Sequence, residues 1–270
     1  MLKRTITGAG IVGVVYLGLL YSHKTLVFVG AMTVLNCMAV YELFHAANMI
    51  KCRKVLATAL TWAVFLSLVP ITEYDRFLCY VFLAASMTFL WLMLRQEHCS
   101  FDEPGKVFWI ALLVTALFRS VPAVRELPNG FYYLTFAITL CFITDIMAYL
   151  VGKAIGKHKL CLKISPNKTV EGSLAGILGA VLCMFLLGKW MEVHRAMTVR
   201  YGLLLLYAIL AALAGEFGDL AMSSFKRVCG VKDFGKLFPG HGGMLDRFDS
   251  QMFAVAFTLL FCTVTGGYLG

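Results

Sequence analysis

The sequence predicts an all-α membrane protein, a single integral membrane domain over residues 1–270 with about nine transmembrane helices. Hydrophobic residues occupy 60% of the positions and charged residues only 14%, whereas roughly a quarter of an ordinary soluble domain is charged. Each crossing of the bilayer uses about 20 apolar residues. Helices that cross the membrane therefore take up nearly the whole chain.

The spans are placed where apolar runs are bounded by charged or turn-forming residues. Lys3 and Arg4 precede the first run, which lacks an obvious signal-peptide cleavage site and is interpreted as a span. The fifth run is weak because Arg119 and Pro122 interrupt it. The nine spans are expected near residues 5–21, 25–43, 55–71, 77–94, 107–124, 131–152, 171–188, 200–222 and 251–269.

The Lys and Arg residues predict the orientation of the chain. Most of the 24 fall at the N-terminus or in the connections that follow the even-numbered spans, and such an excess marks the cytoplasmic side. The N-terminus and the two longest polar connections, residues 153–170 and 223–250, are therefore expected in the cytoplasm. This topology explains the net charge of +9, so no nucleic-acid partner is expected. The nine cysteines include no CxxC pair, which indicates neither a disulfide framework nor a zinc site.

Acidic and basic residues concentrate in one stretch of the C-terminal part. Asp219, Ser223 and Lys226 are spaced i, i+4 and i+7, so they should share one face of a helix. Asp246 and Asp249, spaced i and i+3, should share a face in the first turn of the last span. The same stretch also contains Arg227, Lys232, Asp233, Lys236 and Arg247.

This composition fits a magnesium–nucleotide site. Mg²⁺ is held by one or two carboxylates together with substrate phosphates, while Lys and Arg bind the remaining phosphate oxygens. Gly242 and Gly243 fit as well, because glycines beside a helix start let backbone N–H groups approach a phosphate. Each signal has an ordinary alternative. Lys232 and Asp233 also suit a solvated loop, and a single histidine such as His241 is more often a loop residue than a ligand.

Two segments outside this stretch carry further signals. Asp145 lies within the sixth span, where burying a charge costs at least about 2.5 kcal/mol, so a function is the default hypothesis. The segment SPNKTVEG, residues 165–172, offers phosphate-compatible donors before the seventh span, with Pro166 favouring extended backbone. An ordinary helix cap is the alternative for this segment. Small residues four apart let membrane helices approach, which predicts close packing at Gly172, Gly176 and Gly179.

Together these segments resemble the phosphatidate cytidylyltransferases, also called CDP-diacylglycerol synthases. Every fixed position of that family's signature is met between Ser224 and Asp249. Two further family blocks match residues 145–156 and 165–172. The resemblance therefore covers most of the C-terminal half.

The resemblance is incomplete elsewhere. In the N-terminal helices, residues 1–130, only Tyr41-Glu42-Leu43 weakly resembles a family feature, so the catalytic helices and loops are expected in residues 131–270. Family members commonly carry Glu where this chain has Met222, and Ser or Thr where it has Ile146. The first difference removes a carboxylate near the expected metal site.

The resemblance implies transfer of CMP from CTP to phosphatidate, which gives CDP-diacylglycerol and pyrophosphate for phospholipid biosynthesis. It also implies Mg²⁺ as a cofactor, with a second cation such as K⁺ or another Mg²⁺. The protein would be a multi-pass protein of the cell (inner) membrane with its active site facing the cytoplasm. The family further suggests a homodimer.

The candidate residues are assigned to this reaction by their charge and position. Metal binding is expected of Asp219, Asp246 and Asp249. Catalytic roles are expected of those three and of Lys226, Arg227, Lys232, Asp233, His241 and Arg247. Substrate binding is expected of Asp145, Ser165, Lys168, Thr169, Glu171, Ser223, Gly242 and Gly243.

Two other functions remain as alternatives. A CTP-dependent lipid-alcohol kinase of related fold would transfer the γ-phosphate and release CDP, whereas a cytidylyltransferase releases pyrophosphate. A secondary transporter belongs to a different class, for which broken helices and paired repeats are expected. No internal repeat is visible in the sequence.

Overall fold

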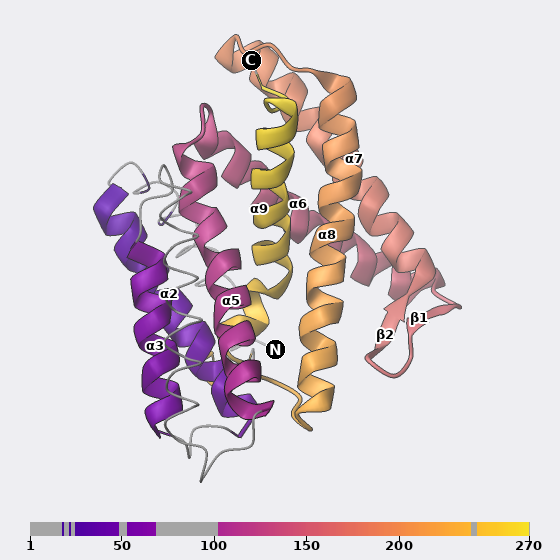
Figure 1. The fold of residues 1–270 in the computed structure, drawn as a ribbon. Coiled ribbons are helices and arrows are strands. Elements are labelled where there is room, and N and C mark those ends of the chain that lie inside the picture. The colour runs from indigo at the N-terminus through magenta and orange to yellow at the C-terminus, as the bar shows by residue number, and fades with distance from the viewer. Residues whose placement is uncertain are drawn as a thin grey trace. The chain divides into compact units, whose positions relative to one another are not determined.

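The computed structural model describes residues 25–48, 53–68, 102–238 and 242–269, together with Gly18 and Ser22. Helices dominate this part of the chain (Figure 1). The helices are α2 (Thr25–Ala46), α3 (Arg53–Leu68), α5 (Asp102–Glu126), α6 (Gly130–Ile155), α7 (Val170–Arg195), α8 (Tyr201–Val228) and α9 (Leu245–Thr265).

The all-α prediction needs one correction. The connection between α6 and α7 contains a two-stranded antiparallel sheet, β1 (Lys159–Cys161) paired with β2 (Ser165–Thr169). Pro166 lies in β2, and a residue before proline is restricted to extended backbone. Proline is also tolerated in an edge strand. The extended segment before α7 is therefore part of a hairpin.

Five helices are long and apolar enough to cross a membrane. They are Leu26–Ala46, Gly130–Ile155, Val170–Arg195, Tyr201–Val228 and Leu245–Thr265, and they coincide with the second, sixth, seventh, eighth and ninth predicted spans. The third and fifth predicted spans are helical, as the shorter α3 and as α5. The first and fourth, residues 5–21 and 77–94, lie outside the described residues. The count of nine and the orientation of the N-terminus stay predictions.

The chain divides into two compact units. The first unit contains residues 1–123 and 231–247, with α2, α3 and most of α5. The second unit contains residues 124–230 and 248–270, with α6, the hairpin, α7, α8 and most of α9. The prediction of a single membrane domain stays a prediction.

Buried polar contacts join the helices of the first unit. Asn36 of α2 donates from Nδ2 to Ser67 Oγ of α3 at 2.8 Å and to Thr115 Oγ1 of α5 at 3.2 Å. Arg119 of α5 is buried, and its Nη1 donates to the Leu66 carbonyl oxygen in the last turn of α3. A helix-end carbonyl without an intrahelical partner is thereby satisfied. Arg119, which weakens the fifth apolar run, is therefore a packing residue, and α5 continues through Pro122.

Glycines bring α6 and α7 into close contact in the second unit. A Cβ atom at Gly172 would meet the Ala148 carbonyl oxygen at 2.6 Å, and one at Gly176 would meet the Thr144 carbonyl oxygen at 2.9 Å. A Cβ at Gly179 would likewise meet a side chain of α6. The predicted role of these three glycines in close helix packing is confirmed.

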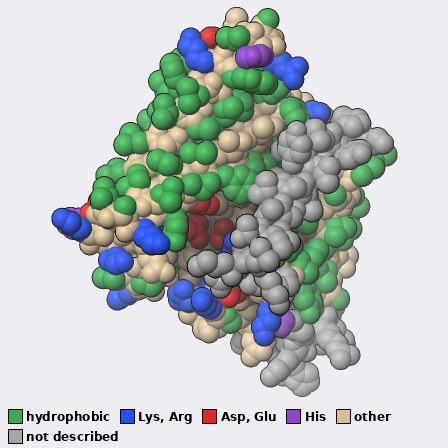
Figure 2. All heavy atoms as spheres, turned by 180° about the vertical axis from the view of Figure 1, so that it is seen from behind, with side chains coloured by type: hydrophobic (Ala, Val, Ile, Leu, Met, Phe, Trp, Pro, Cys, Tyr) green, Lys and Arg blue, Asp and Glu red, His purple; other side chains and the backbone are tan. Residues whose placement is uncertain are grey.

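The outer surface is largely hydrophobic. Figure 2 shows hydrophobic side chains over much of one face, with Lys, Arg and His side chains near its ends. On α7, exposed leucines recur every fourth residue and form an outward ridge, at Leu174, Leu178, Leu182 and Leu186. Side chains four apart lie on the same face of a helix. Such a row of exposed leucines is typical of a helix that faces lipid.

Gly172→Ala should destabilise the protein, because the added methyl group would meet the Ala148 carbonyl oxygen and force α6 and α7 apart. Overpacking of this kind costs about 1–3 kcal/mol. Gly202→Ala in α8 is the matched control, since nothing lies within 4 Å of a Cβ there and alanine favours a helix. The midpoint of thermal unfolding in detergent should fall only for the first variant. Equal midpoints would contradict the close packing.

Candidate functional site

Lys168 and Asp219 form an ion pair in the second unit. Lys168 Nζ of β2 lies 2.7 Å from Asp219 Oδ2 of α8, and Ser223 Oγ, one turn along α8, donates to Asp219 Oδ1 at 3.3 Å. The predicted common face of Asp219 and Ser223 is thus confirmed. The two charged side chains are 24% and 29% exposed. The pair is therefore partly open to solvent, which screens the attraction between the two charges, so both groups can exchange this partner for a ligand.

Asp249 adds a buried carboxylate from α9. Its side chain interacts electrostatically with Asp219 and Lys226 of α8 and with Asp145 of α6. Lys226 is also buried, whereas Asp145 is exposed. A Cβ at Gly218 would meet the Asp249 carbonyl oxygen at 2.8 Å, so α8 and α9 are in backbone contact beside these acids. A buried carboxylate that has other acids near it is costly, and a bound cation would relieve that cost.

The hairpin is tied to the ends of two helices. Thr169 caps α7 by accepting a hydrogen bond from Gly172 N at 3.2 Å, and Glu171 accepts from His158 N and lies 2.6 Å from His158 Nδ1. Arg227, exposed at the end of α8, donates from Nε to the Ile164 carbonyl oxygen at 3.3 Å. The cap interpretation of this segment is therefore confirmed for Thr169.

These contacts hold β2, with Ser165 at its start, against α7 and α8. Lys168 is consequently placed beside Asp219 by the strand. The substrate-binding roles of Ser165, Thr169 and Glu171 stay predictions.

In the first unit, two carboxylates hold the start of α9. Glu42 Oε1 and Oε2 of α2 accept hydrogen bonds from Met244 N and Leu245 N, both at 2.9 Å. Asp246 Oδ2 accepts from Gly243 N at 2.9 Å and from Phe234 N at 2.8 Å. Three successive N–H groups at the helix start, which lack intrahelical partners, are thereby satisfied.

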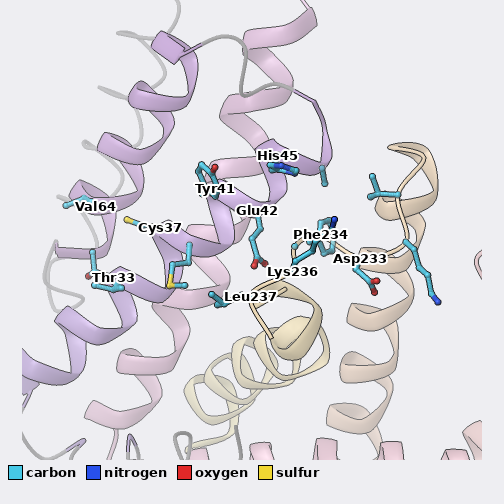
Figure 3. A pocket seen from close by; sticks show the side chains of 16 residues that line it. Thr33, Cys37, Tyr41, Glu42, His45, Val64, Asp233, Phe234, Lys236 and Leu237 are labelled. Carbon is cyan, nitrogen blue, oxygen red and sulfur yellow. The ribbon is translucent and has the colours of Figure 1, made fainter. Parts of the chain in front are cut away.

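Backbone geometry fits this arrangement. A side chain at Gly235 or Gly243 would collide with the Glu42 carboxylate. Gly242 has φ +82°, a conformation that residues with a Cβ rarely adopt. Glu42 extends from α2 toward the segment that carries Asp233 and Phe234 (Figure 3). The roles of Gly242 and Gly243 in phosphate binding, and of Asp246 in metal binding, stay predictions.

The remaining candidates differ in their surroundings. Lys232 and Asp233 are exposed. The Nε atom of Arg247 is buried and has no hydrogen-bond partner within the described part of the chain, and an anionic ligand would satisfy it. His241 lies outside the described residues. Met222, at the position where the resemblance leads one to expect an acid, is buried.

Two further acids were given no functional role from the sequence, although Glu42 belongs to the Tyr41-Glu42-Leu43 feature. Glu42 is buried inside an apolar run, which is the signal that singled out Asp145. Glu216 precedes Asp219 by three residues on α8, so the two lie on one face, and it accepts a hydrogen bond from Ser173 Oγ of α7. Both residues are acids within predicted spans, and this position was the signal that could have identified them.

No group of three or more His, Cys, Asp or Glu side chains among the described residues is arranged to hold a metal ion. A preformed set of that size is not required for Mg²⁺, which takes one or two carboxylates and completes its coordination with water and substrate phosphates. Asp219 and Asp249 are therefore chemically suitable. Their predicted metal binding, like that of Asp246, stays a prediction.

Several of the described helices are long and apolar, which indicates a multi-pass membrane protein. Its candidate site contains acids and lysines at helix ends and in a hairpin. The chain belongs to the Cytidylyltransferase family, whose model matches residues 2–265. The predicted family is thereby confirmed.

Several curated relatives are named phosphatidate cytidylyltransferase. One from Staphylococcus epidermidis is 46% identical over 127 residues, which cover 47% of this chain and 47% of the relative. Another from Bacillus subtilis (strain 168) is 37% identical over 175 residues, 64% of each chain. A third from Staphylococcus aureus (strain COL) is 41% identical over 127 residues. The match to each of these two Staphylococcus relatives spans about half of the relative's length.

Glu42→Gln should lower the stability of the protein, because glutamine keeps the size of the side chain but offers one acceptor oxygen to two buried N–H groups. An unsatisfied buried donor costs about 1–3 kcal/mol. The exposed Glu126 provides the control Glu126→Gln. Thermal unfolding in detergent should show a lower midpoint for Glu42→Gln alone, and an unchanged midpoint would argue against the capping role of Glu42.

Proposed function

We propose that the protein transfers CMP from CTP to phosphatidate and so produces CDP-diacylglycerol and pyrophosphate for phospholipid biosynthesis. The observation that carries this proposal is the accessible Lys168–Asp219 pair beside the buried Asp249 and Lys226. Membership of the Cytidylyltransferase family and the names of the relatives support the same reaction.

In this reaction a phosphate oxygen of phosphatidate attacks the α-phosphorus of CTP. A new P–O bond forms there, the bond from the α-phosphorus to the bridging oxygen breaks, and pyrophosphate leaves with that electron pair. The attacking oxygen is already anionic, so no strong general base is needed. The protein must align the two phosphates and offset the repulsion between anions.

The residues of the second unit suit these tasks. Lys168 can turn from Asp219 to a phosphate oxygen at little cost, because the ion pair is partly exposed. Lys226 supplies a buried positive charge beside Asp249, where low polarity strengthens its attraction for phosphate. Asp219 and Asp249 would hold Mg²⁺, which neutralises phosphate charge when bound. A second cation, K⁺ or another Mg²⁺, would serve the same end.

The remaining candidates have supporting roles in the proposal. Arg247 and Lys232 bind phosphate, and Asp145 is a supporting carboxylate. The protein lies in the cell (inner) membrane with its active site toward the cytoplasm, as the distribution of Lys and Arg favours, and it forms a homodimer.

The purified protein in detergent, supplied with CTP, phosphatidate and Mg²⁺, should release pyrophosphate and form CDP-diacylglycerol. Coupled pyrophosphate detection and mass spectrometry of the lipid measure the two products. Release of CDP with a newly phosphorylated lipid would instead identify a lipid kinase, and no turnover of either kind would overturn the proposal.

Asp219→Asn should reduce kcat on the order of a hundredfold, since removing a charged ligand of the phosphates' cation costs several kcal/mol. This variant is a cleaner test than one at Asp246, whose carboxylate also holds two backbone N–H groups. Glu192→Gln is the control and should keep wild-type kcat, because Glu192 pairs with Lys189 near the C-terminal end of α7. Full activity of Asp219→Asn would refute the assignment of Asp219.

A further inference from the structure

A cavity of about 1040 Å³ lies within the first unit, between α2, α3 and residues 231–237 (Figure 3). Pockets for small molecules usually measure about 300–1000 Å³, so this one is large enough for a sizeable ligand. Much of its wall is one face of α2, with side chains at the three- and four-residue spacing of a helix. These residues include Thr33, Val34, Cys37, Met38, Tyr41 and His45.

The cavity has the length of a lipid chain. From Thr33 to His45, α2 rises about 18 Å at 1.5 Å per residue. One leaflet occupies half of the hydrocarbon core, or about 15 Å. Because α2 is itself apolar and long enough to span a membrane, a groove of this length along it matches the depth of one acyl chain.

The two ends of the cavity differ in polarity. Val34 and Val64 are among the apolar lining residues, and His45, Lys232 and Lys236 are among the basic ones; on α2, Val34 directly follows Thr33 and lies about three turns before His45. Figure 3 shows Thr33, Cys37 and Val64 together on one side, and His45 and Lys236 on the other. The groove thus has an apolar end and an end with cationic side chains.

Two acids also line the cationic end. Glu42 is engaged by backbone N–H groups at the start of α9, so its negative charge is directed at the positive end of that helix. Asp233 is exposed. Lys232 and Lys236 are exposed as well, and their long flexible side chains can turn toward a phosphate.

We propose that this groove holds one acyl chain of the lipid substrate, with the lipid phosphate at Lys232 and Lys236. The inference rests on the proposed function and adds to it a binding site for the lipid. The enzyme would distinguish acyl chains by length at the apolar end, because a longer acyl chain reaches Val34 and Val64 and a short one does not.

The test compares two valines on α2 that have similar exposure. Val34 lines the cavity and is 59% exposed, whereas Val27, which does not line it, is 62% exposed. Val34→Trp should raise the KM for dioleoyl-phosphatidate about tenfold, as expected when about two buried methylene groups are displaced. The KM for dihexanoyl-phosphatidate and for CTP should stay near the wild-type value. Val27→Trp should match the wild type with all three substrates.

A second variant approaches the groove from its other wall. Val64→Trp on α3 should also raise the KM for the long-chain lipid alone, which keeps the test valid if Val34→Trp does not fold. If the folded variants and the wild type share one KM for dioleoyl-phosphatidate, the groove does not hold the chain.

Direct binding separates this inference from the proposed function. Retention of dioleoyl-phosphatidate by the purified protein in detergent, measured by mass spectrometry without CTP, should be weakened by Val34→Trp and not by Val27→Trp. That result without pyrophosphate release by the wild type would keep the groove and reject the reaction. Pyrophosphate release with equal retention by both variants would keep the reaction and reject the groove.

The phosphate end is tested with Lys236→Gln. This variant should raise the KM for both lipids several-fold, because the headgroup is common to them, and leave the KM for CTP unchanged. Lys189→Gln, at an exposed pair of α7, is the control. A higher KM for CTP alone would assign the lysine to the nucleotide and overturn this part of the inference.

Discussion

The structure depends on how the buried backbone N–H groups at the start of α9 are satisfied. A helix begins with N–H groups that have no partner within the helix, and each one left unsatisfied when buried costs about 1–3 kcal/mol. Here Glu42 and Asp246 accept from three successive residues, 243–245. Since Asp246 Oδ2 also accepts from Phe234 N, the same carboxylate joins the segment around Phe234 to the start of α9. Two carboxylates therefore hold the described residues that directly precede α9.

Close helix packing provides the second constraint, in the other unit. Glycines at 172, 176 and 218 leave no room for a Cβ, so α6 contacts α7, and α8 contacts α9, through backbone atoms. Gly218 directly precedes Asp219, so the approach of α8 to α9 occurs where both helices carry acids. Membrane helices usually approach each other closely through small residues such as glycine. In this protein the close approach of α8 and α9 also brings Asp219 and Asp249 near each other, although burying a carboxylate is costly.

Local patterns account for what was predicted well. The helices, the face shared by Asp219 and Ser223, and the packing glycines all follow from residue spacing along one element. The signature from Ser224 to Asp249 identified the family. The pattern did not reveal the β1–β2 hairpin, because three- and five-residue strands are too short to show a period. Nor did it predict the burial of Arg119, whose partner is a carbonyl group on another helix.

The sequence by itself determined the helical membrane character, the family and the types of charged residue available, because composition, hydrophobic period and motif are properties of neighbouring positions. Only the tertiary structure decided which charges meet. Glu42 binds residues about two hundred positions away, and Lys168 of a strand pairs with Asp219 of a helix. The groove along α2 likewise needs residues 231–237 to close it. Such contacts depend on how separate elements pack, and no spacing within a single element encodes them.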